Sequence, residues 1–215
     1  WLGPAPEHPF TKNRWHYNWH WFWDYGAGDI ANDGVHHIDL ARWGLDVGYP
    51  NAISASGAQL FYNDDHETPD TQTVTYEFHD CHLIYEMRLW TPYKLEGHDN
   101  GAVFYGDKGK LEMGRAGCTV TLANGETKNL GGPSDLTAHI RNYLDCIRAN
   151  DPTNLNAPIK EGAISSALCH LGNIAIRVDR KLHFDPSTHT CENDPEANAL
   201  LTKNYRTGYE LPEIG

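Results

Sequence analysis

The sequence predicts a single domain over residues 1–215 of the α+β class, with a large, open and mainly antiparallel sheet and helices on one face. An amphipathic helix comes first, a long run of strand-like segments follows, and two helices come next. This order, without alternating βα units, is typical of α+β folds. The chain is 40% hydrophobic and 21% charged, which is ordinary for one globular domain of this length.

The middle of the chain reads as β structure. Short apolar and β-branched segments alternate there with turn-forming clusters such as Asn63-Asp64-Asp65, His79-Asp80 and Asn124-Gly125. We expect strands at 52–61, 71–78, 82–90, 102–105, 110–113 and 119–122. The very short turn between the second and third of these segments predicts an antiparallel hairpin.

The first helix is expected to open after Gly26-Ala27-Gly28 and to run to about Leu45. Asp29 lies near its start, where a carboxylate suits the positive end of the helix dipole. Gly44 is the expected stop, because glycine readily adopts the left-handed conformation that ends many helices.

The C-terminal part is expected to be mainly helical. Ser134 can cap a helix that runs to about Ala149, and a second helix covers about 159–178. A short strand at 181–184, a short helix at 195–201 and an extended tail complete the chain.

Charge and composition exclude some classes of function. The chain has 17 basic and 29 acidic residues, a formal charge of −12, and no stripe of Lys and Arg that would suit nucleic acid. No apolar run approaches the roughly 20 residues needed to cross a membrane. Five scattered cysteines without a CxxC pair are typical of free thiols. The chain begins at Trp1, as a fragment, a processed product or an incomplete reading frame would, so the compartment, cytoplasmic or periplasmic, stays open.

The sequence predicts no nucleotide-binding domain of the Rossmann type. The fingerprint of such a domain is a glycine-rich turn between a strand and a helix. Gly26-Ala27-Gly28 is the nearest match, but it lacks a third glycine and follows an aromatic segment.

The candidate catalytic residues are His36 and Asn32, four positions apart on the first expected helix. At 100° per residue they share one polar arc with Asp29 and Asp33, while Ile30 and other apolar residues lie on the opposite arc. An imidazole can exchange a proton near neutral pH, and a carboxamide can both donate to and accept from a hydroxyl group. The alternative is a solvated polar face with an ordinary surface histidine.

Residues 1–25 form an aromatic and histidine-rich entry segment, in which 15–25 reads Trp-His-Tyr-Asn-Trp-His-Trp-Phe-Trp-Asp-Tyr. We interpret it as an ordered loop that lines a cleft. Flat rings with hydrogen-bonding groups beside them suit sugar rings, which have apolar faces and polar edges. A buried aromatic core is the alternative. The histidines and aspartates of 16–37 could also supply a metal site, although their spacing matches no metal motif.

These residues resemble a known family. Gly26-Ala27-Gly28 followed by Asn32, Gly34, His36 and Asp39 is similar to the signature G-G-G-x-x-x-D-x-G-x-H-x-x-D of the glucose–fructose oxidoreductase/inositol dehydrogenase/MocA family. The resemblance extends over essentially the whole chain and is to the C-terminal domain alone, whose fold is of the dihydrodipicolinate-reductase-like type. The aromatic loop resembles a branch found in sugar-degrading bacteria.

The resemblance implies the substrate-binding half of an NAD(P)-dependent oxidoreductase that acts on a sugar or cyclitol. His36 would accept or return the hydroxyl proton, beside Asn32, where the family often has a titratable aspartate. Five further residues would hold substrate hydroxyls: Arg14, His16, Tyr17, His20 and Asp33. NAD or NADP is implied, but we do not expect this chain to bind it alone, and no metal is expected.

Three other functions stay open. The chain could be a stand-alone carbohydrate-binding or assembly module, an NAD-dependent glycosidase or lyase of the same family, or a metal-dependent hydrolase or lyase. The family also implies a homodimer or homotetramer formed through the open face of the sheet. The apolar side chains expected on that face are Val74, Tyr76, Ile84 and Met87.

Overall fold

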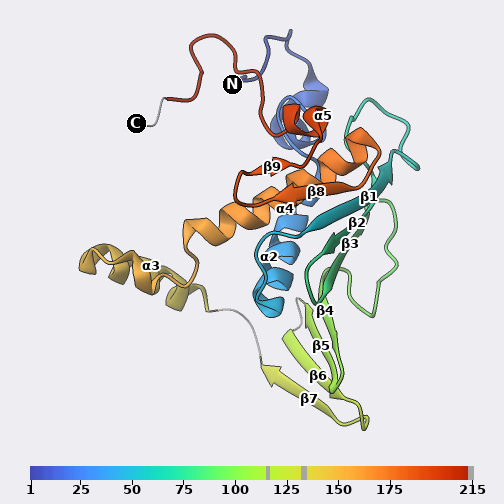
Figure 1. Ribbon diagram of the computed structural model, residues 1–215, viewed down its shortest axis with the longest axis vertical. Helices are drawn as coiled ribbons and strands as arrows, with labels where there is room; N and C mark the ends of the chain where they lie inside the picture. The colour runs from blue at the N-terminus through green and yellow to red at the C-terminus, as the bar shows by residue number, and fades with distance from the viewer. Residues whose placement is uncertain (115–116, 132–134, 213–215) are drawn as a thin grey trace. The chain divides into compact units, whose positions relative to one another are not determined.

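The structure is a computed structural model that describes residues 1–114, 117–131 and 135–212. It divides into two compact units, one built from residues 1–36, 47–91 and 166 onward, the other from residues 37–46 and 92–165. Figure 1 shows the order of their helices and strands. The predicted α+β class is confirmed, but the strands are divided between two antiparallel sheets instead of forming one.

The first unit is built on a five-stranded antiparallel sheet with the strand order β3-β2-β1-β8-β9. Its strands are β1 (Ala52–Ala58), β2 (Thr71–Glu77), β3 (His82–Arg88), β8 (Leu182–Asp185) and β9 (Thr190–Cys191). The expected hairpin is present as β2 and β3, with Val74 opposite Tyr85. The two-residue strand β9 was not expected from the sequence.

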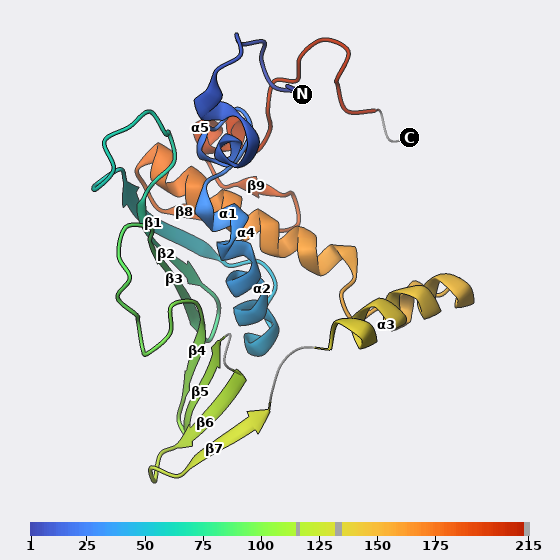
Figure 2. The same cartoon turned by 180° about the vertical axis from the view of Figure 1, so that it is seen from behind.

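One face of this sheet is covered by the part of α4 (Ile159–Val178) that begins at residue 166 (Figure 2). The hydroxyl of Tyr76 on β2 donates a hydrogen bond of 2.9 Å to the carbonyl of Leu168. A Cβ on Gly172 would lie 3.0 Å from the same hydroxyl, so the glycine lets the helix approach the strand closely. Leu168, Leu171 and Ala175 are buried at this contact.

The other face of the sheet is not the apolar surface that was expected. Val74 and Tyr76 are fully buried and Met87 is 7% exposed, whereas Ile84 is 67% exposed. Successive side chains of a strand point to opposite faces, so Ile84 lies on the opposite face from the other three. The expectation of a shared exposed patch was therefore wrong for Val74, Tyr76 and Met87.

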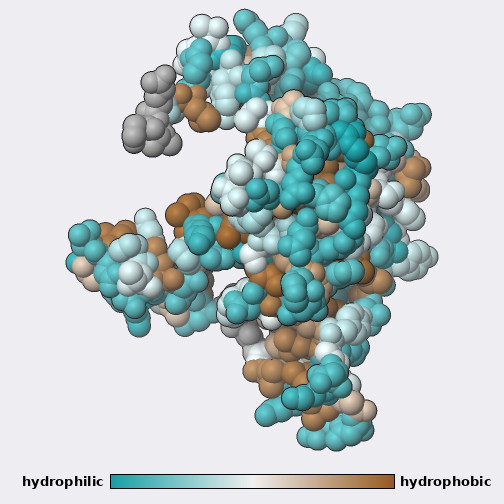
Figure 3. Space-filling model, viewed as in Figure 1, coloured by the Kyte–Doolittle hydropathy of each residue, from teal (hydrophilic) through white to brown (hydrophobic). Residues whose placement is uncertain are grey.

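The second unit contains a four-stranded antiparallel sheet whose strands follow the chain order. They are β4 (Gly101–Gly106), β5 (Gly109–Gly114), β6 (Gly117–Leu122) and β7 (Thr127–Gly131), the last of which was not expected. The helix α3 (Leu136–Ala149) follows, and the carboxylate of Asp135 caps it by accepting from the N–H of Ala138. The expected cap, Ser134, lies outside the described residues. Apolar side chains of α3 are exposed among polar ones (Figure 3).

The first expected helix is broken into two. Its parts are α1 (Asp29–Asn32) and α2 (Gly34–Leu45), and Asp33 separates them. Gly44 does not stop α2, because the left-handed residue after the helix is Asp46, with φ +56°. Gly44 is instead needed for packing, since a Cβ there would lie 2.5 Å from the ring of Phe104.

Short elements complete the chain. They are the 3-10 helices η1 (Lys12–Arg14), η2 (His16–Trp21) and η3 (Pro152–Asn154) and the helix α5 (Pro195–Ala199). All five cysteines are free thiols. None of the helices in the described ranges is long and apolar enough to span a membrane.

Candidate functional site

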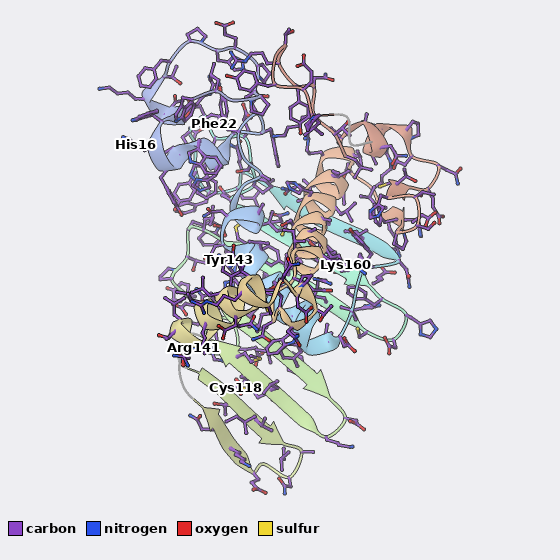
Figure 4. All side chains as sticks on the ribbon, turned by 90° about the vertical axis from the view of Figure 1, so that its left-hand side faces the viewer. His16, Phe22, Cys118, Arg141, Tyr143 and Lys160 are labelled. Carbon is purple, nitrogen blue, oxygen red and sulfur yellow. The ribbon has the colours of Figure 1, made fainter. Side chains whose placement is uncertain are left out.

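The aromatic segment is ordered by ring contacts and by the turns of η1 and η2. The ring of Trp15 lies 4.6 Å from that of His16 and 5.3 Å from that of Trp1, and Trp1 in turn lies 5.5 Å from Tyr25. Phe22 is buried beneath this segment, whereas Trp1 is 66% exposed. Figure 4 shows His16 and Phe22 on this segment. The segment is therefore an ordered surface anchored by the buried side chains of Phe22 and His20, and it is not a buried aromatic core.

The glycines after this segment allow close approaches of the backbone. A Cβ on Gly26 would lie 2.4 Å from the Cα of His20. Gly28 has φ +72°, its N–H donates to the carbonyl of His20 at 2.9 Å, and a Cβ there would lie 2.8 Å from Cβ of Thr68. The Gly-Ala-Gly sequence thus packs the start of α1 against the aromatic segment.

Three of the predicted site residues are brought together here. The amide of Asn32 donates a hydrogen bond of 3.0 Å to the hydroxyl of Tyr17, and the ring of Tyr17 lies edge-on, 4.6 Å from that of His20. The α1 helix carries Asn32, and η2 carries both of the other residues. The structure therefore groups a carboxamide, a phenol and an imidazole, although Asn32 lies 12 positions from the nearest of the other two in the sequence.

The imidazole of His20 is buried, with 2% of its surface exposed. Burial lowers its pKa, against the opposing effect of a hydrogen bond to the backbone carbonyl of Tyr17. Because a carbonyl oxygen can only accept, Nδ1 of His20 is the donor in that bond. Nε2 is then a buried acceptor, and no described group hydrogen-bonds to it. Buried polar atoms are almost always satisfied, so this nitrogen is suited to receive a ligand hydroxyl.

His20 and Asn32, but not Tyr17, are among the residues that line a hollow of about 270 Å³. One wall consists of the aromatic segment and α1, and the other consists of α4 and the chain after α5. The polar side chains that line it are His20, Asn32, His170, Asn173, Arg177 and Lys203, and the aromatic ones are Trp19, Trp23 and Tyr25. Its volume is close to the lower end of the range for small-molecule sites.

Asn173 on α4 fixes the position of the glycine-containing turn. Its Nδ2 donates to the carbonyl of Ala27 at 2.7 Å, and its Oδ1 accepts from Gln72 at 3.2 Å. Asn173 and Gln72 are both buried, at 3% and 1% exposure. The turn before α1 is therefore attached through α4 to β2, which gives the hollow a rigid floor.

His36 and Asp33 do not line this hollow. His36 lies on the first turn of α2 and is exposed, and Asp33 is exposed at the break between α1 and α2. The break places Asn32 and His36 on different helices, so they do not share the continuous polar arc expected from the sequence. Gly34 fixes the start of α2, because a Cβ there would lie 2.5 Å from the hydroxyl of Tyr85 on β3.

Arg14 and His16 also lie apart from Asn32. The guanidinium of Arg14 is 4.9 Å from the centre of the Phe22 ring, and Arg14 lines a separate hollow of about 220 Å³ together with Trp1 and Trp15. His16 is exposed and contacts Trp15. The structure therefore supports a grouping of Asn32, Tyr17 and His20, but it does not add Arg14 or His16 to it.

Sequence reasoning missed the contribution of α4. His170, Asn173 and Arg177 follow one another at spacings of three and four, which places them on one face of a helix. That polar stripe was a usable signal, but the sequence could not show that it faces the aromatic segment. Lys203 carried no comparable signal.

Asp29 was expected to be an ionised carboxylate that interacts with the helix dipole, but its pKa is raised in the structure. Burial raises its pKa to about 6, and the nearby charge of Asp33 acts in the same direction. The carboxyl group therefore exchanges its proton near neutral pH. It is not among the residues that line either hollow.

The described residues do not fit a dinucleotide. Every strand pairing among them is antiparallel, whereas the nucleotide-binding βαβ unit requires parallel strands. The Gly-Ala-Gly turn also follows a 3-10 helix and leads into a helix of only four residues. Within ranges 1–114, 117–131 and 135–212, no three His, Cys, Asp or Glu side chains are grouped as metal ligands would be.

Comparison with known protein families defines the class of protein. Residues 1–211 match the model of the glucose–fructose oxidoreductase/inositol dehydrogenase/MocA oxidoreductase family, C-terminal alpha/beta domain. The chain belongs to this family and corresponds to its C-terminal domain. A comparison with curated protein sequences found no match.

Solved structures show the same fold at low sequence identity. An oxidoreductase of Agrobacterium radiobacter, solved with NAD+, L-tartaric acid and magnesium, has a TM-score of 0.55 and 16% identity over 72% of this chain and 48% of its own. The WlbA dehydrogenase from Chromobacterium violaceum, solved with NADH and UDP-GlcNAcA, has a TM-score of 0.56 and 18% identity over 78% and 49%. A Desulfitobacterium hafniense protein assigned as an NADPH-dependent oxidoreductase has a TM-score of 0.59 and 14% identity over 78% and 51%. The chain thus spans about half the length of these structures.

Proposed function

We propose that this chain is the substrate-binding part of an NAD(P)-dependent oxidoreductase that acts on a sugar or a cyclitol. The observation that carries the proposal is the array of Asn32, Tyr17 and His20 beside a hollow with aromatic walls. Family membership supports the reaction class, and the dinucleotide complexes of related structures support the cofactor class.

The array suits a polyhydroxylated ligand. Nε2 of His20 can accept from one hydroxyl, and Oδ1 of Asn32 can accept from another, because the amide nitrogen of Asn32 already donates to Tyr17. Trp19 and Trp23 offer flat apolar faces to the C–H side of a ring. The hollow thus combines the two kinds of surface that a sugar or cyclitol presents.

His36 is proposed to move the hydroxyl proton. Asn32 cannot titrate, so it can position a hydroxyl but cannot share the proton with His36. The imidazole of His36 is exposed at the start of α2, so a hydroxyl of the substrate can reach it. Redox chemistry belongs to the cofactor, and the described residues do not fit it, so we assign to this chain only the holding of the substrate and the transfer of its proton.

Binding experiments on the 215-residue chain test the proposal. Quenching of tryptophan fluorescence would be measured with myo-inositol, glucose and NADH. We expect saturable binding of at least one polyol, weakened roughly fivefold by Asn32→Ala because a neutral hydrogen bond contributes about 1 kcal/mol. Asn63→Ala, an exposed loop asparagine, is the matched control and should leave the affinity unchanged.

Two results would contradict the proposal. Polyol binding that Asn32→Ala leaves intact would place the substrate elsewhere. Turnover with NAD+ or NADP+ by the chain alone would show that it holds a nucleotide site and is a complete enzyme.

A further inference from the structure

The hollow contains basic groups that a neutral sugar does not require. His170 and Arg177 come from α4, and Lys203 comes from the chain after α5. The guanidinium of Arg177 lies 5.1 Å from the centre of the Trp23 ring, and Nζ of Lys203 donates to the carbonyl of Trp23 at 2.9 Å. Trp23 thus anchors two of the three basic side chains at one wall.

The basic groups repel one another. Although Lys203 is exposed, partial desolvation lowers its pKa, and the charge of Arg177 acts in the same direction, while Asp24 opposes both. Partial desolvation also lowers the pKa of His170, and the charge of Lys203 contributes. The carboxylate of Asp24, whose charge acts on Lys203, also forms a hydrogen bond of 2.9 Å with Nε2 of His8.

The positive charge that His170, Arg177 and Lys203 bring to this hollow contrasts with the net negative charge of the chain. The chain as a whole has a formal charge of −12, so basic side chains gathered at one hollow are not a general property of its surface. Among the residues that the structure describes, no aspartate or glutamate lines the same hollow. A negatively charged group placed there would reduce the repulsion among the three basic residues and would form charge-assisted hydrogen bonds with Arg177 and Lys203.

We propose that Arg177, Lys203 and His170 bind an anionic group, a carboxylate or a phosphate, carried by the substrate of this site. The proposal rests on the proposed function, and it narrows the substrate class from sugars and cyclitols to their acidic derivatives. The substrate then has two recognised parts. Its hydroxyls face His20 and Asn32 on one wall, and its anionic group faces α4 and the C-terminal segment on the other.

Isothermal titration calorimetry at fixed ionic strength tests this substrate class with four probes: glucose, glucuronate, glucose 6-phosphate and inorganic phosphate. We expect glucuronate, glucose 6-phosphate or both to bind at least tenfold more tightly than glucose, because hydrogen bonds to charged groups are the stronger kind. The relative affinity of these two sugars tells whether the site selects a carboxylate or a phosphate. Equal affinities for glucose and both acidic sugars would overturn the proposal.

Variants identify the residues responsible. Arg177→Gln and Lys203→Gln should each remove most of the preference for acidic sugars and leave glucose affinity within about twofold. Lys160→Gln removes one charge from an exposed position on the same helix α4 and should change nothing (Figure 4). Arg177→Lys, which keeps the charge, should retain part of the preference. Because Lys203 is exposed, its variant remains informative even if the Arg177 variant fails to fold.

The outcomes separate the two proposals. A preference for acidic sugars that survives both glutamine variants would overturn the anion site, while polyol binding weakened by Asn32→Ala would still support the proposed function. Binding of inorganic phosphate that Arg177→Gln abolishes, without binding of any sugar, would support the anion site and reject the proposed function.

Discussion

Replacing Gly34 with alanine tests how the start of α2 is fixed on the first unit. Gly34 belongs to the family signature and lies two residues before His36. A Cβ at this position would lie 2.5 Å from Oη of Tyr85 and 2.8 and 2.9 Å from two carbons of its ring. Tyr85 is 8% exposed and is held in β3, so its ring cannot move aside without disturbing the core.

The magnitude follows from two opposing terms. Forcing an extra methyl group into a packed site costs about 1–3 kcal/mol. Alanine recovers up to about 1 kcal/mol, because glycine is a poor helix former. The net loss should be about 1–2 kcal/mol, which corresponds to a decrease in Tm of roughly 2–8 °C for a chain of this size.

Differential scanning calorimetry would measure this change against a matched control. Gly162→Ala places the same methyl group on α4, where it would meet no described atom within 4 Å apart from its chain neighbours and the adjoining backbone of the helix, so it should raise Tm by a few degrees. In the Tyr85→Leu background the penalty for Gly34→Ala should largely disappear, because the atoms that it meets have been removed. An unchanged or higher Tm for Gly34→Ala, or an equal penalty in that background, would refute the reasoning.

Two further predictions concern carboxyl groups. The raised pKa of Asp29, about 6 against 3.8, means that wild-type stability falls as pH rises from about 4 to 6. Asp29→Asn should therefore be more stable than wild type by up to about 3 kcal/mol at pH 7.5 and equal to it near pH 4, as measured by urea unfolding. Asp70 is fully buried, and although burial opposes its ionisation, the N–H groups of Leu60, Tyr62 and Phe61 lower its pKa to about 2. Asp70→Asn should lose about 2 kcal/mol at pH 7, a difference that shrinks as pH falls from 4 through 2; a constant difference would contradict this account.

Local sequence patterns predicted most of the elements. The hairpin of β2 and β3 and the helix α4 lie where strand alternation and helical periodicity place them. Local sequence patterns gave a wrong prediction where the role of a residue depends on a packing contact. Gly44 reads as a helix stop, yet it provides space for Phe104, and only the packed structure contains that contact.

The candidate site was predicted in part. Asn32, Tyr17 and His20 were chosen for their chemistry, and the fold brings them together. Their grouping with Arg14 and His16 was not reproduced, because the turns of η1 and η2 direct those two side chains to other contacts.

By itself the sequence determined the α+β class, the family and the kinds of side chain available for chemistry. Periodicity and motif spacing are local properties, so they can be recognised from the order of the residues alone. The tertiary structure decided which of these side chains share a hollow. Arg177 and Lys203 lie more than 140 positions beyond Asn32, and long-range packing of α4 and the C-terminal segment places all three around it. Spacing carries no information about such contacts, because they depend on burial and on the approach of segments that are distant in the chain.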